Sequence, residues 1–378
     1  MEQSVSDSEA IRERIRHALR QVIDPELRQP LPDLGMIGDI SVSPDSVATV
    51  TLKLTISGCP AATSLEQQVR ECVSAVSGVS TAVVDVTVMT REERTALITR
   101  LRGPGRRRQF GADSLTRVYA ITSGKGGVGK STVTAELAVA LSRRSLRVGL
   151  IDADVFGFSI PAILGIPHAR PTRVGEMIVP PIAHGVAVIS IGMFVEHTPG
   201  KSAPAVAWRG PMLHRTIEQF LTDVYFGDLD IVLLDLPPGT GDIAISVGQL
   251  LPHAEVIVVT TPQPAAADVA ERSGIVARQT GQTVFGVVEN MAGLAGPDGT
   301  ILDLFGAGGG QLLADRLGVP LLASIPLSIP LRHGGDTGVP LSLDPADDPA
   351  AAAITQLAEI LATRPRGLAG RKLGVSVR

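Results

Sequence analysis

The chain has 378 residues, of which 44% are hydrophobic but only 3% aromatic, and its formal net charge is −4. This length predicts two domains with aliphatic cores, and the weak acidic charge gives no general attraction to nucleic acid or to an anionic membrane. The sequence has only two cysteines, Cys59 and Cys72, which excludes a disulfide framework and favours a reducing cytoplasm.

The N-terminal part of the chain has the pattern of a small mixed domain. Residues 8–22 carry apolar side chains at helical spacing, and residues 48–56 alternate apolar with polar side chains, as in a half-buried strand. The other expected elements are a strand, a helix and a last strand, over residues 36–42, 62–76 and 79–89. We therefore expect an α+β domain over residues 1–99.

Basic residues mixed with glycine and proline separate this domain from the rest of the chain. The run from Arg100 to Arg108 is open to two interpretations, a patch for phosphate or nucleic acid and a solvated tether. We favour the tether because the chain as a whole is acidic, and we expect a linker over residues 100–115. At the other end, residues 364–378 are expected to form a basic tail.

Between linker and tail, short apolar runs alternate with helical stretches. The apolar runs are strand-length and rich in valine, isoleucine and leucine, at residues 118–122, 147–152, 186–191, 231–235, 255–260, 284–289 and 321–325. This alternation is typical of parallel strands that are covered by helices on both faces. The sequence therefore predicts an α/β domain over residues 116–363, with a doubly wound, mainly parallel sheet.

The segment after the first of these strands matches the phosphate-binding loop G-x-x-x-x-G-K-[ST]. Its residues are Gly124, Lys125, Gly126, Gly127, Val128, Gly129, Lys130, Ser131 and Thr132. The same glycines also fit the weaker dinucleotide motif G-x-G-x-x-G, but a pyrophosphate on a bare helix N-terminus needs neither Lys130 nor Ser131. We therefore expect Lys130 to bind the outer phosphates and the Ser131 hydroxyl to hold Mg²⁺.

Two acidic segments follow strands of the predicted sheet. Asp152 and Asp154 come after residues 147–151, and Asp235 ends the strand 231–235. Open α/β sheets bind their ligands at the carboxyl ends of the strands, so these side chains are expected near the phosphate loop. A strand-terminal aspartate beside such a loop normally holds Mg²⁺ through water, and Asp235 fits this role.

Several motifs together resemble the Mrp/ApbC iron–sulfur cluster carrier ATPases. Lys125 is the additional lysine of the deviant P-loop ATPases, and the other matching segments begin at Asp152, Trp208, Asp235, Val288 and Phe305. The N-terminal part resembles the SufT-like iron–sulfur assembly domain. Its marks are Asp24-Pro25-Glu26, Asp33-Leu34-Gly35-Met36 and Gly58-Cys59-Pro60.

The resemblance implies a slow, Mg²⁺-dependent ATPase that works as a homodimer. Such a protein would receive iron–sulfur clusters from an assembly scaffold and transfer them to apoproteins. In this family Lys125 would reach the phosphates of the partner subunit, and Asp154 would position the attacking water, with Asp152 beside it. Asn290 would read the adenine edge, and the turn around Pro326 would flank the base.

The sequence departs from this family at the cluster site. Many members carry Cys-x-x-Cys where this chain has Gly296 and Gly299, and glycine offers no ligand to a cluster. Of the two cysteines, Cys72 is expected in a helix core, whereas Cys59 precedes a helix whose N-terminus can lower a thiol pKa. Any bound cluster is therefore expected at Cys59, together with ligands from a partner.

Two alternatives stay open, and the sequence disfavours a third. The chain could be an ATPase chaperone or scaffold that does not ligate a cluster itself, which the missing cysteine pair favours. It could be a positioning ATPase of the ParA/MinD type, which shares Lys125 but has no small N-terminal domain. A nucleotide-gated electron donor would need interface cysteines in the ATPase domain, and both cysteines precede it.

Overall fold

A computed structural model describes residues 2–103, 109–155, 157–195, 210–296 and 300–364. The chain divides into two compact units. The first contains Met1–Arg107 together with Pro171–Pro180, and the second contains Arg108–Arg170 and Pro181–Arg378. The short segment 171–180 therefore belongs to the first unit although it lies in the middle of the predicted ATPase sequence.

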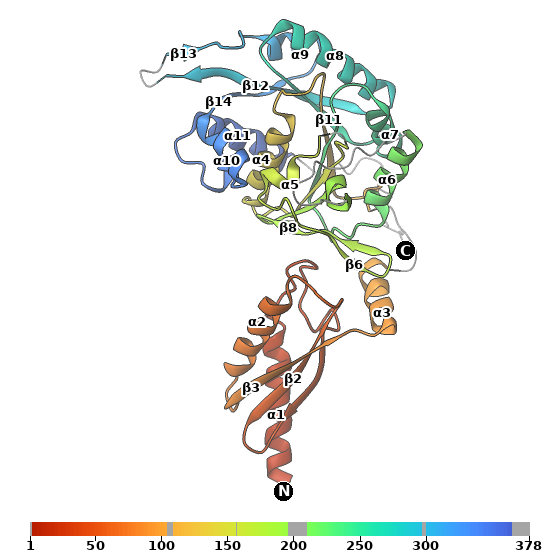
Figure 1. Cartoon of the computed structure of the whole chain (residues 1–378), viewed down its shortest axis with the longest axis vertical. Coiled ribbons are helices and arrows are strands. Elements are labelled where there is room, and N and C mark those ends of the chain that lie inside the picture. Colours follow the sequence, from red (N-terminus) through yellow and green to blue (C-terminus); the bar gives the residue numbers. More distant parts are fainter. Residues whose placement is uncertain (1, 104–108, 156, 196–209, 297–299, 365–378) are drawn as a thin grey trace, which may run out of the picture. The chain divides into compact units, whose positions relative to one another are not determined.

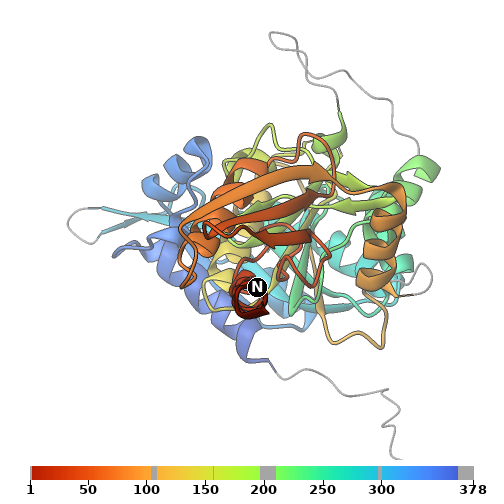
Figure 2. The same ribbon diagram turned by 90° about the horizontal axis from the view of Figure 1, so that it is seen from below.

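The first unit is built around three strands in the order β1-β2-β3, seen side by side in Figure 2. Strand β2 is antiparallel to β1 and parallel to β3. Residues of β2 are alternately buried and half-buried, as the sequence pattern predicts, and helices α1 and α2 cover the buried face. The bounds are α1 Glu2–Leu19, β1 Ile37–Val42, β2 Val47–Leu54, α2 Ala62–Ser74 and β3 Thr81–Val88.

The segment 171–180 forms a hairpin of two short strands, β6 Thr172–Val174 and β7 Met177–Val179. The Thr172 hydroxyl donates a hydrogen bond to Oε1 of Glu26, at 3.1 Å. Burial raises the pKa of Glu26 to about 7, against the lowering effect of this hydrogen bond. The hairpin thus supplies a polar partner to the Asp24-Pro25-Glu26 segment of the first unit.

The predicted linker begins too early. Helix α3 (Arg91–Arg102) includes Arg100, and it starts with a capping box in which Thr90 and Glu93 satisfy each other's backbone N–H groups. Glu93 also forms an ion pair with Lys53 at 2.6 Å. Residues 104–108 of the basic run and residues 365–378 of the expected tail lie outside the described part of the chain.

The second unit confirms the doubly wound, mainly parallel sheet. Its described residues form nine strands, in the order β13-β12-β11-β4-β10-β5-β9-β8 with β14 beside β12. Only β8 and β13 run antiparallel to their neighbours. The bounds are β4 Arg117–Ser123, β5 Val148–Asp152, β8 Ile182–Ala183, β9 Val186–Ser190, β10 Ile231–Asp235, β11 Glu255–Thr260, β12 Thr283–Ala295, β13 Ile301–Leu302 and β14 Leu321–Leu327.

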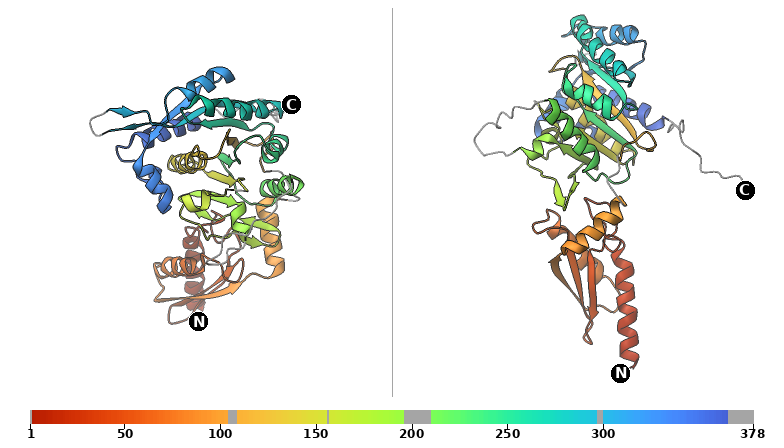
Figure 3. Two further views of the ribbon diagram at one scale, coloured as in Figure 1. Left: turned by 45° about the horizontal axis from the view of Figure 1, so that its top comes forward. Right: turned by 90° about the vertical axis from the view of Figure 1, so that its right-hand side faces the viewer.

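Helices cover both faces of this sheet (Figures 1 and 3). Helices α4 (Lys130–Ser142) and α11 (Pro349–Thr363) contact each other on one face, whereas α7 (Asp242–Leu250), α8 (Pro264–Gln279) and α9 (Gly309–Leu317) follow one another on the other. The remaining helices are α5 Ile160–Ile163, α6 Gly210–Thr222 and α10 Ile329–Thr337. The central strands β4, β5, β9, β10 and β11 are almost entirely buried and aliphatic, as parallel strands covered on both faces must be.

Strand β12 is longer than the sequence predicts. The apolar run ends at Glu289, but the strand continues to Ala295. Its pairing with β14 is irregular between Asn290 and Leu294, where Met291 has a φ of 62°. The regular pairing of the two strands is therefore interrupted at a residue in the left-handed region, which is uncommon for residues other than glycine.

Candidate nucleotide site

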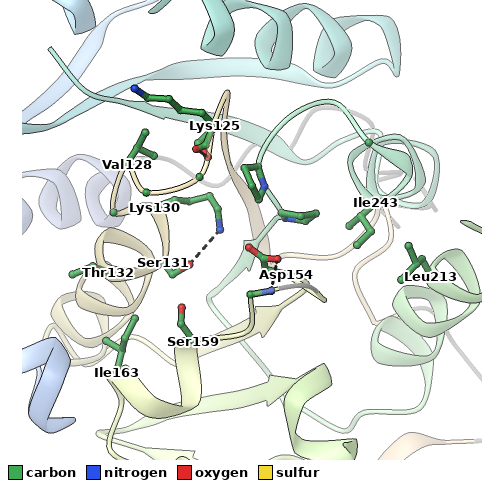
Figure 4. Close-up of a pocket in the computed structure, with 18 of the residues that line it drawn as sticks. Lys125, Val128, Lys130, Ser131, Thr132, Asp154, Ser159, Ile163, Leu213 and Ile243 are labelled. Atoms are coloured by element: carbon green, nitrogen blue, oxygen red, sulfur yellow. Dashed lines mark hydrogen bonds between the residues drawn. The ribbon is translucent and has the colours of Figure 1, made fainter. Parts of the chain in front are cut away.

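The phosphate loop lies between β4 and α4, where the sequence predicts it. Gly127 and Gly129 adopt φ values of 79° and 77°, which side chains disfavour. A Cβ atom on Gly124 would lie 2.3 Å from the backbone nitrogen of Ala270, so the loop requires glycine there. The loop borders a cavity of about 700 Å³, shown in Figure 4. It is lined by Ser123, Lys125–Thr132, Asp154, Gly157, Ser159, Ile163, Leu213, Pro237, Pro238 and Gly241–Ile243.

A buried polar cluster joins the loop to the end of β10. The ammonium group of Lys130 lies 2.7 Å from Oδ2 of Asp235, and both side chains are buried. The hydroxyl of Ser131 donates to the same oxygen at 2.6 Å, and that of Thr134 lies 2.9 Å from the other. Ser131 and Asp235 thus present adjacent oxygen donors, the ligand type that Mg²⁺ prefers.

The two aspartates that follow β5 differ in their surroundings. Asp152 is paired in register with Asp235, is fully buried, and accepts hydrogen bonds from the Ser190 hydroxyl (2.8 Å) and the Asp154 N–H (3.2 Å). Burial and the neighbouring Asp235 raise the pKa of Asp152 to about 8. Asp154 instead lines the cavity, and its Oδ1 accepts from the Gly157 N–H at 3.0 Å. Only Asp154 is therefore placed to face a ligand.

Lys125 is exposed, unlike Lys130. Figure 4 shows its side chain directed away from Lys130 and from the interior of the cavity. Within one chain the two lysines of the loop therefore do not converge on the same point.

A second cavity of about 460 Å³ adjoins the first and shares Gly129, Thr132 and Ile163 with it. Asn290 and Pro326, both expected to contact a base, line this second cavity. The side-chain amide of Asn290 donates to the Val128 carbonyl oxygen of the phosphate loop, at 2.9 Å. The structure thus brings both residues together with the loop.

Other residues of the second cavity escaped the sequence analysis. They come mainly from the end of β12 and from α10, and are Met291, Leu294, Leu304, Ser328, Ile329, Leu331, Arg332, Gly335 and Asp336. The only local signal was the Ile325-Pro326-Leu327 turn, because α10 begins directly after it.

Cys59 lies in the first unit, three residues before α2 begins at Ala62, and is only 8% exposed. Burial raises the pKa of its thiol, and Glu26 and Asp24 add to this effect, whereas backbone N–H groups of Ala61 and Ala62 oppose it. The expected lowering of the thiol pKa is therefore wrong, because desolvation outweighs the helix N-terminus.

The remaining metal candidates give no further site in the described part of the chain. Burial also raises the pKa of Cys72, which is half-buried in α2. Among the described residues, His, Cys, Asp and Glu nowhere gather in a group of three or more that could hold a metal. Gly296 donates its N–H to the Thr300 carbonyl, while Gly299 lies outside the described residues. None of the described helices is long and apolar enough to cross a membrane.

The chain is similar to known proteins along nearly its whole length. A family model for NUBPL iron-transfer P-loop NTPases matches residues 114–362, and a model for iron–sulfur cluster assembly proteins matches residues 12–86. The iron–sulfur cluster carrier protein of Mycobacterium tuberculosis (strain ATCC 25618 / H37Rv) is 53% identical over 371 residues, which cover 96% of each chain. That of Synechocystis sp. is 38% identical over 350 residues, covering 91% of this chain and 95% of the relative.

Two solved structures resemble the second unit. A nucleotide-binding protein from Archaeoglobus fulgidus, in complex with ADP, has a TM-score of 0.52 at 36% identity and covers 59% of this chain and 86% of its own. The septum site-determining protein MinD from Pyrococcus horikoshii, complexed with Mg-ADP, has a TM-score of 0.50 at 26% identity, covering 66% and 96%. The resemblance inferred from the motifs is confirmed, and the chain belongs to the family of NUBPL iron-transfer P-loop NTPases.

Proposed function

We propose that this protein is a cytoplasmic, Mg²⁺-dependent ATPase that carries iron–sulfur clusters from an assembly scaffold to apoproteins. The observation that carries the proposal is the buried Lys130–Asp235–Ser131 cluster beneath the phosphate loop of an iron-transfer NTPase. The carrier proteins that resemble it along nearly the whole chain support the choice of cargo. In this proposal the first unit handles the cluster and the second unit handles the nucleotide.

The nucleotide would occupy the two adjoining cavities. Its phosphates would lie against the N–H groups of residues 124–132, and its base would lie between Asn290 and Pro326. Nucleotide binding requires the ammonium group of Lys130 to change its partner, because it is paired with Asp235 in this structure. The phosphates would draw the ammonium group away, and Mg²⁺ on Ser131, with Asp235 holding its water, would restore positive charge beside the carboxylate. Asp154 would then orient the attacking water.

A second copy of the chain would complete the phosphate site. Lys125 points away from its own cavity, which suits a lysine that reaches the phosphates of a partner subunit. We expect Lys125→Ala to leave nucleotide binding by the monomer intact but to reduce hydrolysis at least about tenfold and to weaken nucleotide-dependent dimerisation. An ATP hydrolysis assay would measure the first effect, and light scattering with and without ATP would measure dimerisation. A wild-type rate in this variant would contradict the role of Lys125 in trans.

Cys59 is the proposed protein ligand of the cluster. Since burial raises its thiol pKa, the thiolate that iron requires has to form as the metal binds, and cluster uptake should improve above neutral pH. Anaerobic reconstitution with iron and sulfide, after chelator treatment, tests this in the full chain. We expect the wild type and Cys72→Ser to hold a stoichiometric cluster by iron, acid-labile sulfide and absorption, and Cys59→Ser to lose it.

The second candidate function is a scaffold or chaperone that uses the same ATPase without binding a cluster itself. The observation that favours it is Gly296, which offers no side-chain ligand where the family resemblance implies the first cysteine of a pair. Absence of a cluster in the wild type would support this candidate and leave the ATPase proposal untouched. A full cluster in Cys59→Ser would instead show that other ligands hold it.

A further inference from the structure

Glu289 is a buried acidic side chain that the proposed function does not use. It is 6% exposed and precedes Asn290 on β12. Its Oε1 accepts the N–H of Gly310 at 2.7 Å, and its Oε2 accepts the hydroxyl of Ser324 at 2.9 Å. Both donors are uncharged. Burial of a carboxyl group without a cation is costly, so a merely space-filling role would favour an apolar residue here.

The hydrogen bond to Ser324 links β12 to β14. These two strands carry the second cavity, where the proposed function places the base and which we call the base cavity. Glu289 is paired in register with Ser324, and the next pair is Asn290 with Ile325. Asn290 therefore follows Glu289 directly on β12, and Pro326 follows this second pair on β14. A hydrogen bond at this point fixes the register of β12 against β14, and with it the positions of Asn290 and Pro326 in the cavity.

The hydrogen bond between Glu289 and Ser324 lies next to irregular positions in the pairing of β12 with β14. The pairing of β12 with β14 is irregular between Val287 and Val288 and again directly after Asn290, where Met291 adopts a left-handed conformation. A slip of one residue turns a side chain to the opposite face of a sheet. A fixed side-chain contact at the Glu289–Ser324 pair, directly before the Asn290–Ile325 pair, therefore holds Asn290 on one face of the sheet.

The hydrogen bond to Gly310 explains the glycine-rich start of α9. A Cβ atom on Gly310 would lie 2.5 Å from Cβ of Glu289, and one on Gly309 would lie 2.4 Å from the carbonyl oxygen of Pro262. Any larger residue would push the helix away from the strand. The glycines let the first turn of α9 bring its N–H within reach of Glu289, so helix and strands share one anchor.

We infer that Glu289 is a positioning residue for base recognition. It ties β12 to β14 and to α9, so that the amide of Asn290 is presented to the base cavity and to the Val128 carbonyl of the phosphate loop. The inference rests on the proposed role of Asn290 as the residue that reads the base. It assigns to Glu289 no contact with the nucleotide.

Binding of Mg-ADP and Mg-GDP to the full chain tests this. We expect Glu289→Ala to reduce the preference for ADP over GDP about tenfold, the effect of losing one well-oriented hydrogen bond, with no change in affinity for inorganic pyrophosphate. Glu289→Gln keeps an acceptor for Gly310 and a group that can bond the Ser324 oxygen, and should retain the preference. The matched control is Glu136→Ala. This residue is another buried acid, whose oxygens accept the N–H groups of Leu341 and Ser342 at 2.8 Å.

The outcomes separate this inference from the proposed function. A wild type that binds ADP and GDP equally would overturn base reading by Asn290, and this inference with it. A wild type that discriminates, together with Glu289→Ala that discriminates as well, would overturn this inference alone. A loss of preference in Glu136→Ala would also overturn it, since any buried acid would then suffice. If Glu289→Ala does not fold, Ser324→Ala, which removes one of the two hydrogen bonds, must lower the preference by a smaller factor.

Discussion

Replacement of Lys130 by alanine is expected to abolish ATP hydrolysis and to destabilise the second unit at the same time. The ammonium group forms a buried ion pair with Asp235 at 2.7 Å. Its removal leaves a buried carboxylate with hydroxyl partners only, which typically costs about 3–5 kcal/mol. It also removes the positive charge that would stabilise the transferred phosphoryl group, a loss of about a thousandfold in rate or more. Steady-state hydrolysis and urea unfolding would measure the two effects.

The double variant Lys130→Ala/Asp235→Asn separates these effects. Because it removes both charges of the pair, it should recover most of the lost stability, yet it should stay inactive. Equal stability of the single and double variants would contradict the buried ion pair as the cause of the destabilisation. Hydrolysis at a wild-type rate in the single variant would contradict the assignment of the phosphate loop.

Replacement of Asp154 by asparagine is expected to stop hydrolysis without weakening nucleotide binding. Asparagine keeps an oxygen that can accept the Gly157 N–H, so the local fold should survive. It lacks the negative charge that would orient and activate the attacking water, a contribution of about 10²–10⁴ in rate. Single-turnover hydrolysis and the dissociation constant of ADP are the required measurements.

Asp152→Asn is the matched control for this variant. With a pKa of about 8, the Asp152 carboxyl group is mainly protonated at pH 7, and asparagine imitates that form. Since the native state holds this proton and the unfolded state releases it near the ordinary aspartate pKa of 3.8, Asp152 should lower wild-type stability as pH rises from about 4 to about 8. Asp152→Asn should not show this fall and should keep hydrolysing at pH 7. Equal inactivation of both variants would contradict the distinct role of Asp154.

Local patterns were sufficient to predict the parallel sheet of the second unit and its phosphate loop. Aliphatic runs that alternate with helical stretches predicted the parallel sheet, because strands covered on both faces have no polar positions. The phosphate loop and Asp235 were predicted from spacing alone, since the carboxyl ends of neighbouring parallel strands converge. The contact of Ser131 and Lys130 with Asp235 is the direct outcome of that topology.

One local signal and several features that depend on distant contacts were missed. The basic residues at the end of α3 suggested a linker, although the Thr90–Glu93 capping box was present in the sequence. The raised pKa of Cys59 depends on burial by the rest of its unit, which no local motif reveals. The continuation of β12 beyond Glu289 depends on pairing with β14, and the α10 side of the base cavity has no pattern of its own.

The hairpin of β6 and β7 also constrains how the protein is made. The hydrogen bond between Glu26 and Thr172 spans 146 residues, and both partners belong to the first unit. During synthesis the ribosome must therefore translate well into the nucleotide-binding sequence before the small unit has all of its parts. The small unit can complete its fold only after residue 180 has been added, when synthesis of the second unit is already under way.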